Sequence, residues 1–257
     1  MATSKRYQNI LITGASSGIG EALALQYAKT TAARLFLSGR NEERLQDVCR
    51  RCKDLGAETE CKIIDVTDRQ AMKEWINQCE KKAPLNIVIA NAGVGTINEN
   101  DDSIYKTFDT NLYGVLNTIL PAIANFRSRK ADGTEKSVVL VSSMAGYHGL
   151  YTCPSYSASK AAVKAYGEAL RIRLRPEGIN VNTVCPGFVR SRITDQNTCP
   201  MPFFMEAPAA AKVIATGIDN NTGLISFPAP MRFIAWLGSI LPNWLSDFIY
   251  SKLPYKA

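Results

Sequence analysis

The chain has 257 residues, and 46% of them are apolar, which is enough for a substantial core and excludes a disordered chain. Its formal charge is +7, from 30 basic and 23 acidic residues. The basic residues are scattered along the chain without a compact basic motif, so nucleic acid is not expected as a partner.

The N-terminal region and the cysteines indicate a cytoplasmic protein. The apolar run NILIT, residues 9–13, is far too short for the core of a signal peptide. Seven cysteines without regular spacing are typical of reduced thiols, and these include Cys49 and Cys52 of a C-x-x-C motif in a predicted helix. The only histidine, His148, lies far from that motif in the sequence, so no metal site is expected.

Short apolar runs alternate with helix-like stretches along most of the chain. The predicted strands are residues 9–13, 34–38, 61–65, 86–91, 137–143, 179–184 and 224–227. Because these runs are apolar throughout, both faces of each strand are expected to be buried, as in a parallel sheet. The alternation predicts an α/β fold, with a Rossmann-type, doubly wound parallel sheet of about seven strands in a single domain. Residues 1–228 are assigned to this domain and residues 229–257 to an apolar C-terminal extension.

The first predicted strand runs directly into the sequence TGASSGIG, residues 13–20, and then into a helix. Gly14 allows a tight turn, Gly18 allows the backbone to approach a pyrophosphate, and Gly20 allows close packing of the helix. The unpaired N–H groups at the start of the helix suit phosphate oxygens. A strand, a glycine-rich turn and a helix in this order predict a dinucleotide site.

The second predicted strand bears on which dinucleotide is bound. An acidic residue about 20 positions after the glycine turn would bind the 2′-hydroxyl of NAD. The strand end reads LFLSGRN, residues 35–41, with Gly39 at the expected acidic position and Arg40 after it. An arginine offers a planar set of donors to a 2′-phosphate, and Ser38 adds a hydroxyl. NADP(H) is therefore predicted, with NAD(H) as the less favoured alternative.

The stretch PSYSASKAAV, residues 154–163, places Tyr156 four residues before Lys160 among small neighbours. Residues at this spacing share a helix face, so both side chains are expected to project into one cleft. A phenol with its ordinary pKa of about 10 is a poor acid–base catalyst near neutral pH. The ammonium group of Lys160 is expected to lower the pKa of Tyr156. The alternative is a surface tyrosine and lysine on an amphipathic helix.

Over roughly residues 7–190, the chain resembles the short-chain dehydrogenase/reductase family. TGASSGIG resembles the spaced-glycine motif of the family, and IIDVTD, residues 63–68, resembles its adenine-binding strand end. ANAG, residues 90–93, resembles the family's Asn-Asn-Ala-Gly signature, with Ala90 in place of the first asparagine. PGFVRS resembles the loop that contacts the nicotinamide, with a serine where a threonine is common.

The same resemblance implies a catalytic set, which consists of Asn111, Ser143, Tyr156 and Lys160. It implies that Tyr156 protonates a carbonyl oxygen while NADPH delivers hydride to the carbonyl carbon. Ser143 would donate a hydrogen bond to that oxygen as negative charge develops. Asn111 resembles the residue that holds a water in a proton relay to Lys160, and Lys160 also resembles the residue that holds the nicotinamide ribose.

The cofactor-binding residues combine the glycine turn, the second strand end and the residues that the resemblance implies. They are expected to be Gly14, Ser16, Ser17, Gly18, Ile19, Gly20, Ser38, Arg40, Asp65, Val66, Asn91, Ala92, Gly93, Tyr156, Lys160, Pro186, Gly187, Val189 and Ser191.

Less regular segments are expected to determine the substrate. Residues 188–210 include an apolar run, residues 200–205, whose composition suits either a lid over a hydrophobic carbonyl compound or the packing of a short helix on the sheet. His148, Tyr151 and Cys153 lie near the expected cleft. Each is interpreted as a loop residue, with a substrate contact as the less favoured alternative.

The C-terminal extension, residues 229–257, carries two of the three tryptophans. It lacks the stretch of about 20 apolar residues that a transmembrane helix needs. Three interpretations remain open: packing over the substrate cleft, an oligomer contact, or an amphipathic helix on a membrane surface.

The sequence thus predicts an NADP(H)-dependent oxidoreductase that acts on a carbonyl compound or secondary alcohol, with a hydrophobic substrate of unspecified identity. The alternative is a non-catalytic NADP(H) sensor of the same fold. Members of the family often pair through the two long helices that correspond to residues 101–126 and 154–175, so a homodimer or homotetramer is expected.

Overall fold

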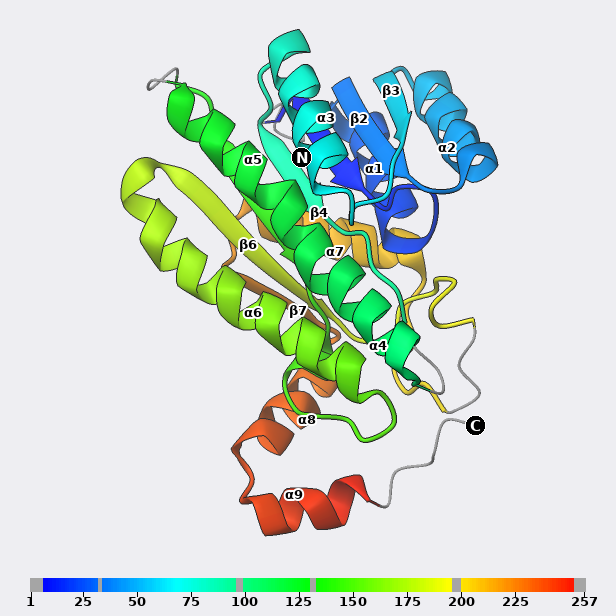
Figure 1. The fold of residues 1–257 in the computed structure, drawn as a ribbon, viewed down its shortest axis with the longest axis vertical. Helices are drawn as coiled ribbons and strands as arrows, with labels where there is room; N and C mark the ends of the chain where they lie inside the picture. Colours follow the sequence, from blue (N-terminus) through cyan, green and yellow to red (C-terminus); the bar gives the residue numbers. More distant parts are fainter. Residues whose placement is uncertain (1–6, 32–33, 96–98, 130–132, 196–199, 252–257) are drawn as a thin grey trace.

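The computed structural model describes residues 7–31, 34–95, 99–129, 133–195 and 200–251. Within these ranges, seven parallel strands form one sheet in the order β3-β2-β1-β4-β5-β6-β7 (Figure 1). The strands are β1 (Asn9–Thr13), β2 (Arg34–Gly39), β3 (Glu58–Ile63), β4 (Ile87–Ala90), β5 (Lys136–Val141), β6 (Ile179–Pro186) and β7 (Leu224–Phe227). The predicted fold class is confirmed.

Helices cover both faces of the sheet. One face is covered by α1 (Gly18–Thr31), α2 (Glu42–Asp54) and α7 (Ala207–Asp219). The other face is covered by α3 (Arg69–Lys82), α5 (Gly114–Ser128) and α6 (Pro154–Leu174). An apolar cluster of buried residues fills each of the two layers, and the strands of the sheet contribute to both. The central strands are therefore apolar throughout, because neither of their faces meets water.

The strand order reverses beside β1, which has β2 on one side and β4 on the other. The chain therefore leaves the carboxyl ends of β1 and β4 toward opposite faces, and a crevice opens between the two connections. Loops that follow β1, β4, β5 and β6 gather around this crevice. The topology alone thus places the glycine turn after β1 at the position where open α/β sheets bind ligands.

β3 begins earlier than the sequence predicted. The apolar run at residues 61–65 predicted this strand, whereas β3 spans Glu58–Ile63. β3 forms an edge of the sheet and pairs only with β2. Its residues are consequently less buried than those of the central strands, and Glu58, Lys62 and Ile63 are exposed. At an edge, hydrophobicity is a weaker guide to strand bounds than at the centre of a sheet.

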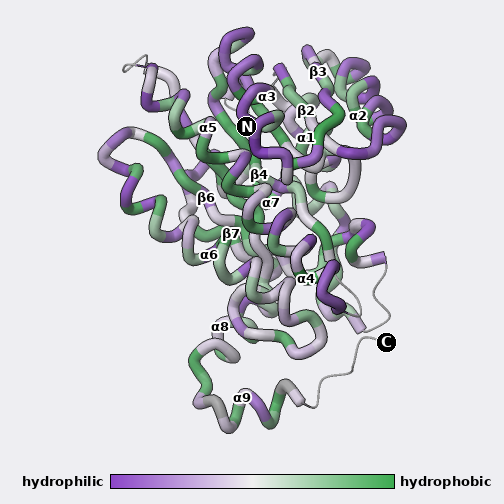
Figure 2. The backbone as a smooth tube through the Cα atoms, in the orientation of Figure 1, coloured by the Kyte–Doolittle hydropathy of each residue, from purple (hydrophilic) through white to green (hydrophobic). Residues whose placement is uncertain are grey.

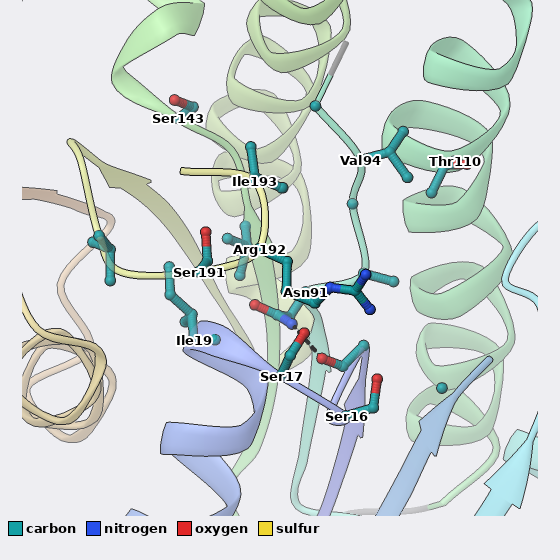
Figure 3. A pocket seen from close by; sticks show the side chains of 18 of the residues that line it. Ser16, Ser17, Ile19, Asn91, Val94, Thr110, Ser143, Ser191, Arg192 and Ile193 are labelled. Carbon is teal, nitrogen blue, oxygen red and sulfur yellow. Dashed lines mark hydrogen bonds between the residues drawn. The ribbon is translucent and has the colours of Figure 1, made fainter. Parts of the chain in front are cut away.

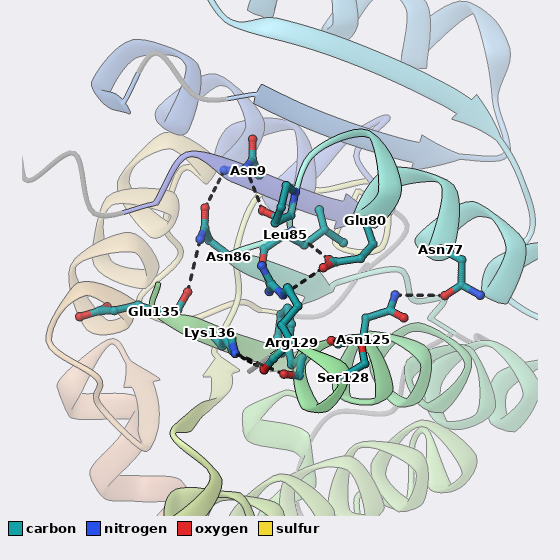
Figure 4. A network of polar contacts seen from close by, with 12 residues as sticks. Asn9, Asn77, Glu80, Leu85, Asn86, Asn125, Ser128, Arg129, Glu135 and Lys136 are labelled. Atoms are coloured by element: carbon teal, nitrogen blue, oxygen red, sulfur yellow. Dashed lines mark hydrogen bonds and ion pairs between the residues drawn. The ribbon is translucent and has the colours of Figure 1, made fainter. Parts of the chain in front are cut away.

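A polar network joins the amino ends of the strands, at the end of the sheet opposite the crevice (Figure 4). The side-chain oxygen of Asn86 accepts hydrogen bonds from the backbone N–H groups of Gln8 and Asn9, each at 3.0 Å. The guanidinium of Arg129 pairs with the carboxylate of Glu80 at 3.0 Å, and both side chains are largely buried. These contacts hold β1 beside β4, and the end of α5 beside α3.

The cysteines depart from the expectation that all thiols are reduced. Cys49 of α2 and Cys61 of β3 form a disulfide bond. Cys52, the other cysteine of the C-x-x-C motif, is a free and buried thiol. The sequence prediction was wrong for this pair because Cys61 lies 12 residues after Cys49, and only the packing of α2 on the edge strand brings the two sulfurs together.

Two further helices, α8 (Ala229–Ile240) and α9 (Asn243–Tyr250), follow β7 and stand at one end of the molecule (Figure 1). The first turn of α8 packs against the loop after β6. A Cβ atom added at Gly187 in that loop would lie 2.6 Å from the sulfur of Met231 in α8. Among the residues described, no helix combines the length and apolar character needed to cross a membrane.

Candidate active site

The turn after β1 forms a cradle that only glycine permits. Gly14 and Gly18 have positive φ angles of 66° and 59°, a region that other residues rarely adopt. A Cβ atom at Gly14 would lie 2.7 Å from the Cα atom of Ala92, and one at Gly20 would lie 2.3 Å from the carbonyl oxygen of Gly14. α1 begins at Gly18, so its first N–H groups face the crevice.

A cavity of about 570 Å³ follows the carboxyl ends of the strands from this cradle to α6 (Figure 3). It brings together most of the residues that the sequence predicted for catalysis and cofactor binding: Gly14, Ser16, Ser17, Gly18, Ile19, Arg40, Val66, Asn91, Ala92, Gly93, Ser143, Tyr156, Lys160, Pro186, Gly187, Val189 and Ser191. Gly20, Ser38, Asp65 and Asn111 do not line it. Glycine backbone and titratable side chains thus line the same cavity.

Asn91 joins the end of β4 to the glycine turn by hydrogen bonds. Its side-chain amide donates to the carbonyl oxygens of Thr13 at 3.0 Å and Gly14 at 3.2 Å. Its backbone N–H donates to the hydroxyl of Thr13 at 3.1 Å. The alanine at position 90, which departs from the family signature, is buried in the sheet and takes no part in these contacts.

Tyr156 and Lys160 lie one turn apart on α6 and both line the cavity. The Nζ atom of Lys160 is 5.7 Å from the centre of the Tyr156 ring. The same Nζ donates to the carbonyl oxygen of Val141 at 3.0 Å. Gly93 leaves room for it, since an added Cβ there would lie 3.4 Å from Nζ. The predicted shared cleft is therefore present.

The pKa values of this pair differ from the sequence expectation. Burial raises the pKa of Tyr156 to about 12, against a hydrogen bond with Ser143 that lowers it. Burial also lowers the pKa of Lys160 to about 8. The prediction that Lys160 lowers the pKa of Tyr156 below its ordinary value was wrong. The low dielectric disfavours the ammonium of Lys160 and the phenolate of Tyr156 alike.

A carboxylate holds the first turn of α6, which carries Tyr156. One oxygen of Glu99 accepts from the backbone N–H of Ser155 at 2.9 Å and from its hydroxyl at 2.7 Å. Cys153, at the N-cap position, makes no side-chain cap. A negative charge near the N-terminus of a helix is favourable, so Glu99 supplies from a distant loop the cap that the local sequence lacks.

Asn111 lies in a π-helical turn, Asp109–Tyr113, between α4 (Asp101–Phe108) and α5. Its side chain is fully buried behind the cavity wall. The amide oxygen accepts from the N–H of Val94 at 2.8 Å, and the amide nitrogen donates to the carbonyl of Val94 at 3.0 Å. The nitrogen also lies 3.3 Å from the hydroxyl of Ser159. The side chain therefore fixes the loop after β4 against α6, while its relay role stays a prediction.

Two arginines define the other end of the cavity. Arg40 lies 3.5 Å from the carboxylate of Asp65. Arg44, one turn into α2, also lines the cavity, and its buried Nε makes no hydrogen bond. Ser38 is fully buried and lies outside the cavity. Its predicted contact with a 2′-phosphate is therefore wrong, because β2 directs this side chain into the core.

Asp65 accepts hydrogen bonds at one carboxylate oxygen from the N–H of Thr67 at 3.0 Å and from its hydroxyl at 2.9 Å. Burial acts to raise the pKa of Asp65, but the contacts with Thr67 and Arg40 outweigh it and lower the pKa below its ordinary value. The carboxylate is therefore charged at neutral pH. It orders the loop after β3 and orients Arg40, rather than lining the cavity itself.

The segment after β6 lies directly on the glycine turn. A Cβ atom at Gly18 would lie 2.9 Å from the Cβ atom of Ser191. Thr194 closes a turn over this contact, because its hydroxyl accepts from the N–H of Ser191 at 2.8 Å. Arg192 extends from this turn across the cavity (Figure 3), and its side chain makes no ion pair among the residues that are described. A free positive charge thus faces the phosphate cradle.

The apolar run at residues 200–205 is not a helix, and none of its residues lines the cavity. Its role as a lid stays a prediction. Arg190 lies over the ring of Phe204 at 5.1 Å and pairs with Glu206 at 2.8 Å. Part of the predicted lid, residues 196–199, lies outside the described residues. His148, Tyr151 and Cys153 do not line the cavity either.

Sequence reasoning missed two cationic side chains of the cavity, Arg44 and Arg192. A signal for Arg44 was present, because it follows Arg40 by four residues at the start of a predicted helix and therefore shares its direction. Arg192 carried no such signal, since a long side chain in an irregular segment can point either way. Glu99 was missed for the same reason.

The residues present fit a nicotinamide dinucleotide. The glycine cradle offers backbone N–H groups, Lys160 lies at one end of the cavity, and Arg40 and Arg44 lie at the other. No group of three or more histidine, cysteine, aspartate or glutamate side chains that suits a metal ion occurs within the described parts of the chain.

Comparison with known proteins agrees with this geometry. The short chain dehydrogenase family model matches residues 8–200. An uncharacterized oxidoreductase of Myxococcus xanthus (strain DK1622) is 37% identical over 252 residues, which cover 96% of this chain and 98% of that protein. The 11-beta-hydroxysteroid dehydrogenase-like 4A protein of Arabidopsis thaliana is 30% identical over 250 residues, covering 92% of this chain and 81% of that protein.

Among solved structures, a short-chain dehydrogenase from Sphingobium yanoikuyae in complex with NADPH has a TM-score of 0.78 and 25% identity, with 96% of each chain covered. Other solved structures of this fold hold NAD. The comparisons therefore support a nicotinamide cofactor. Since the family model spans most of the chain and the relatives are aligned over nearly all of it, the chain belongs to the short-chain dehydrogenase family of oxidoreductases.

Proposed function

We propose that this protein is an NADP(H)-dependent oxidoreductase that transfers hydride between the nicotinamide and a carbonyl compound or secondary alcohol. The observation that carries the proposal is the meeting of Ser143, Tyr156 and Lys160 in the cavity that also contains the glycine cradle. The cofactor, when bound, supplies or accepts the hydride. The chain itself positions the reactants and moves the proton.

Tyr156 is the proton donor in the reducing direction. With a pKa of about 12, its phenol is fully protonated at neutral pH and is ready to donate. Ser143 makes a hydrogen bond to the phenol, so its hydroxyl lies next to the group that donates the proton. A hydroxyl in this place stabilises negative charge as it develops on the substrate oxygen. Lys160 lies close enough to favour the phenolate that donation leaves behind.

NADP(H) is the preferred cofactor in this proposal. Arg40 and Arg44 line the cavity with guanidinium groups that suit a 2′-phosphate, and Gly39 stands in place of a carboxylate that would repel it. Replacing either arginine by glutamine should weaken NADPH binding about tenfold and leave NADH binding nearly unchanged. Arg50→Gln is a matched control, because Arg50 lies on α2, as Arg44 does, and pairs with Asp47 away from the cavity. Equal losses for both cofactors would contradict the assignment.

The substrate class is a hydrophobic carbonyl compound or its alcohol. Val94 and Ile193 both line the cavity, and a Cβ atom added at Gly95 would lie 2.6 Å from Ile193. Such walls bury apolar substrate surface and offer it few polar partners. Relatives named as hydroxysteroid dehydrogenases support the same class.

The test is NADPH oxidation over a panel of ketones and aldehydes, with alcohols and NADP in reverse. Tyr156→Phe should lower kcat/KM by about 100-fold to 10,000-fold. The dissociation constant of NADPH, measured by fluorescence titration, should change little. If wild type binds NADPH but turns over nothing on the panel, the non-catalytic sensor becomes the better description. A Tyr156→Phe variant as active as wild type would remove Tyr156 from the mechanism.

A further inference from the structure

The two last helices form an apolar surface that the other described residues leave exposed. We call residues 229–251, with α8 and α9, the C-terminal hairpin. It stands at the end of the molecule, and its chain is largely hydrophobic (Figures 1 and 2). Within the described residues it exposes eight large apolar side chains: Phe233, Ile234, Trp236, Leu237, Ile240, Trp244, Phe248 and Ile249.

The exposure is substantial and concentrated. Trp244 is 73% exposed and Phe248 is 63% exposed. On the other elements, large exposed apolar side chains occur one or two to an element, as with Leu55 after α2 and Val213 on α7. Single exposed apolar residues are ordinary, but a concentrated apolar patch on a water-soluble domain marks a surface that binds something.

α8 is amphipathic in a way that suits immersion in an apolar layer. At 3.6 residues per turn, its five exposed apolar residues fall within about 160° of the helix circumference. Arg232 and the buried Gly238 lie next to the two edges of this arc, and the half-buried Ala235 lies opposite it. A broad convex face of this kind can be covered from one side by a deformable partner.

The net charge of the whole chain favours an anionic partner. Within α8 and α9 the charges of Arg232 and Asp247 balance, so the attraction comes from the rest of the molecule. The whole chain carries a formal charge of +7. A net positive charge favours attachment of an apolar face to a surface that bears negative headgroups.

The two tryptophans favour a lipid surface over a second copy of the chain. The indole ring joins an apolar body to one N–H donor, and such rings collect at the boundary between hydrocarbon and headgroups. The helices have 12 and 8 residues, too short to cross a bilayer but long enough to lie in its surface. We propose that the C-terminal hairpin docks this protein on the surface of an anionic lipid bilayer, with its apolar arc in the outer part of the hydrocarbon.

The test compares two leucines of equal exposure. Leu237 of the hairpin and Leu55 at the end of α2 are both 40% exposed. Leu237→Glu and Leu55→Glu therefore remove the same side chain and add the same charge at two different places. Binding is measured by co-sedimentation with vesicles of phosphatidylcholine alone and of phosphatidylcholine with phosphatidylglycerol. Leu237→Glu should weaken binding to the mixed vesicles about tenfold or more, and Leu55→Glu should leave it unchanged.

Tryptophan fluorescence gives a second readout on the full chain. Trp75 is buried, so a blue shift on adding mixed vesicles reports on Trp236 and Trp244. The shift should be present in wild type and Leu55→Glu and lost in Leu237→Glu. Phe248→Glu on α9 should also lose the blue shift and weaken vesicle binding. Agreement between the two variants shows that the effect is not specific to position 237. Circular dichroism shows that each variant is folded.

Three results would overturn the proposal. One is failure of the wild-type protein to bind mixed vesicles. Another is equal loss of binding in the two leucine variants. The third is a dimer in solution that Leu237→Glu converts to a monomer while vesicle binding is absent, since the hairpin would then contact a second copy of the chain. Vesicle binding does not depend on turnover, so these results stand apart from the test of the proposed oxidoreductase activity.

Discussion

Lys160 carries its ammonium group at a place from which water is largely excluded. Only 3% of the residue is exposed, and its Nζ atom makes one hydrogen bond to a backbone carbonyl. Burial lowers its pKa to about 8, from 10.5 in a solvated lysine. Below pH 8 the charged form is present in both the folded and the unfolded chain, so the folded state bears the full cost of burying it.

This cost predicts how stability responds to pH. Between pH 8 and about 10.5 the folded lysine is neutral while the unfolded lysine is still charged, so the cost falls as pH rises. Lys160→Met should therefore gain stability relative to wild type at pH 7, by up to about 3 kcal/mol. The gain should shrink toward pH 10. Urea unfolding of both proteins across this range measures the difference, and a difference that is constant with pH would contradict the shift.

Lys164 supplies a control of opposite sign on the same helix. Its ammonium pairs with Glu168 at 2.8 Å and lies 4.9 Å from the centre of the Tyr147 ring. Burial acts to lower the pKa of Lys164, but these partners raise it above its ordinary value. The contribution of Lys164 to stability is therefore present below the unfolded pKa and lost at higher pH. The stability of wild type relative to Lys164→Met should fall as Lys164 titrates.

Arg192 is predicted to contribute to cofactor affinity rather than to the chemical step. It faces the glycine cradle, and no carboxylate neutralises it among the described residues. Arg192→Gln should raise the dissociation constant of NADPH by about three- to tenfold, with a smaller effect at high salt. Fluorescence titration measures the change. Arg190→Gln is the control, since Arg190 pairs with Glu206 outside the cavity. Equal losses in the two variants would contradict a direct contact of Arg192.

At the scale of elements, α2 is tied to the edge strand β3 by the disulfide between Cys49 and Cys61. The bond closes a segment of 12 residues, for which chain entropy gives about 3 kcal/mol of stabilisation. Cys61→Ser should therefore unfold at lower urea concentration than wild type. Reductant should abolish the difference between the two proteins. Mass spectrometry after alkylation should find two thiols of wild type blocked until reduction, and full alkylation without reductant would contradict the bond.

Most of the elements could be predicted from the sequence, because a buried parallel strand needs an unbroken apolar run and the glycine turn has a fixed spacing. The π-helical turn at Asn111 could not be predicted. It shifts the backbone hydrogen bonds by one residue within a long helical stretch, and composition does not report such a shift. Tyr156 and Lys160 line one cavity from α6, as their spacing predicts, but the direction of the Tyr156 pKa depends on three-dimensional burial that spacing does not reveal.

At the scale of the whole molecule, we propose that two copies associate through α4, α5 and α6, as the family resemblance implies. This face exposes Tyr105, Tyr113, Leu120 and Ile172, and Ile172 is 78% exposed. Ile172→Glu should shift the mass measured by light scattering from dimer or tetramer toward monomer. Val213→Glu on α7 is the control and should leave the mass unchanged. A wild-type monomer at all concentrations would contradict the proposal.

Because Met231 packs against Gly187, which lines the cavity, α8 begins beside the cavity. If the hairpin is bound to a bilayer, a hydrophobic substrate that has partitioned into the same bilayer reaches the enzyme by lateral diffusion. The quantity that sets the rate is then the two-dimensional density of substrate among lipid molecules. Diluting the substrate with additional inert lipid would slow turnover even when its total amount in the tube is constant.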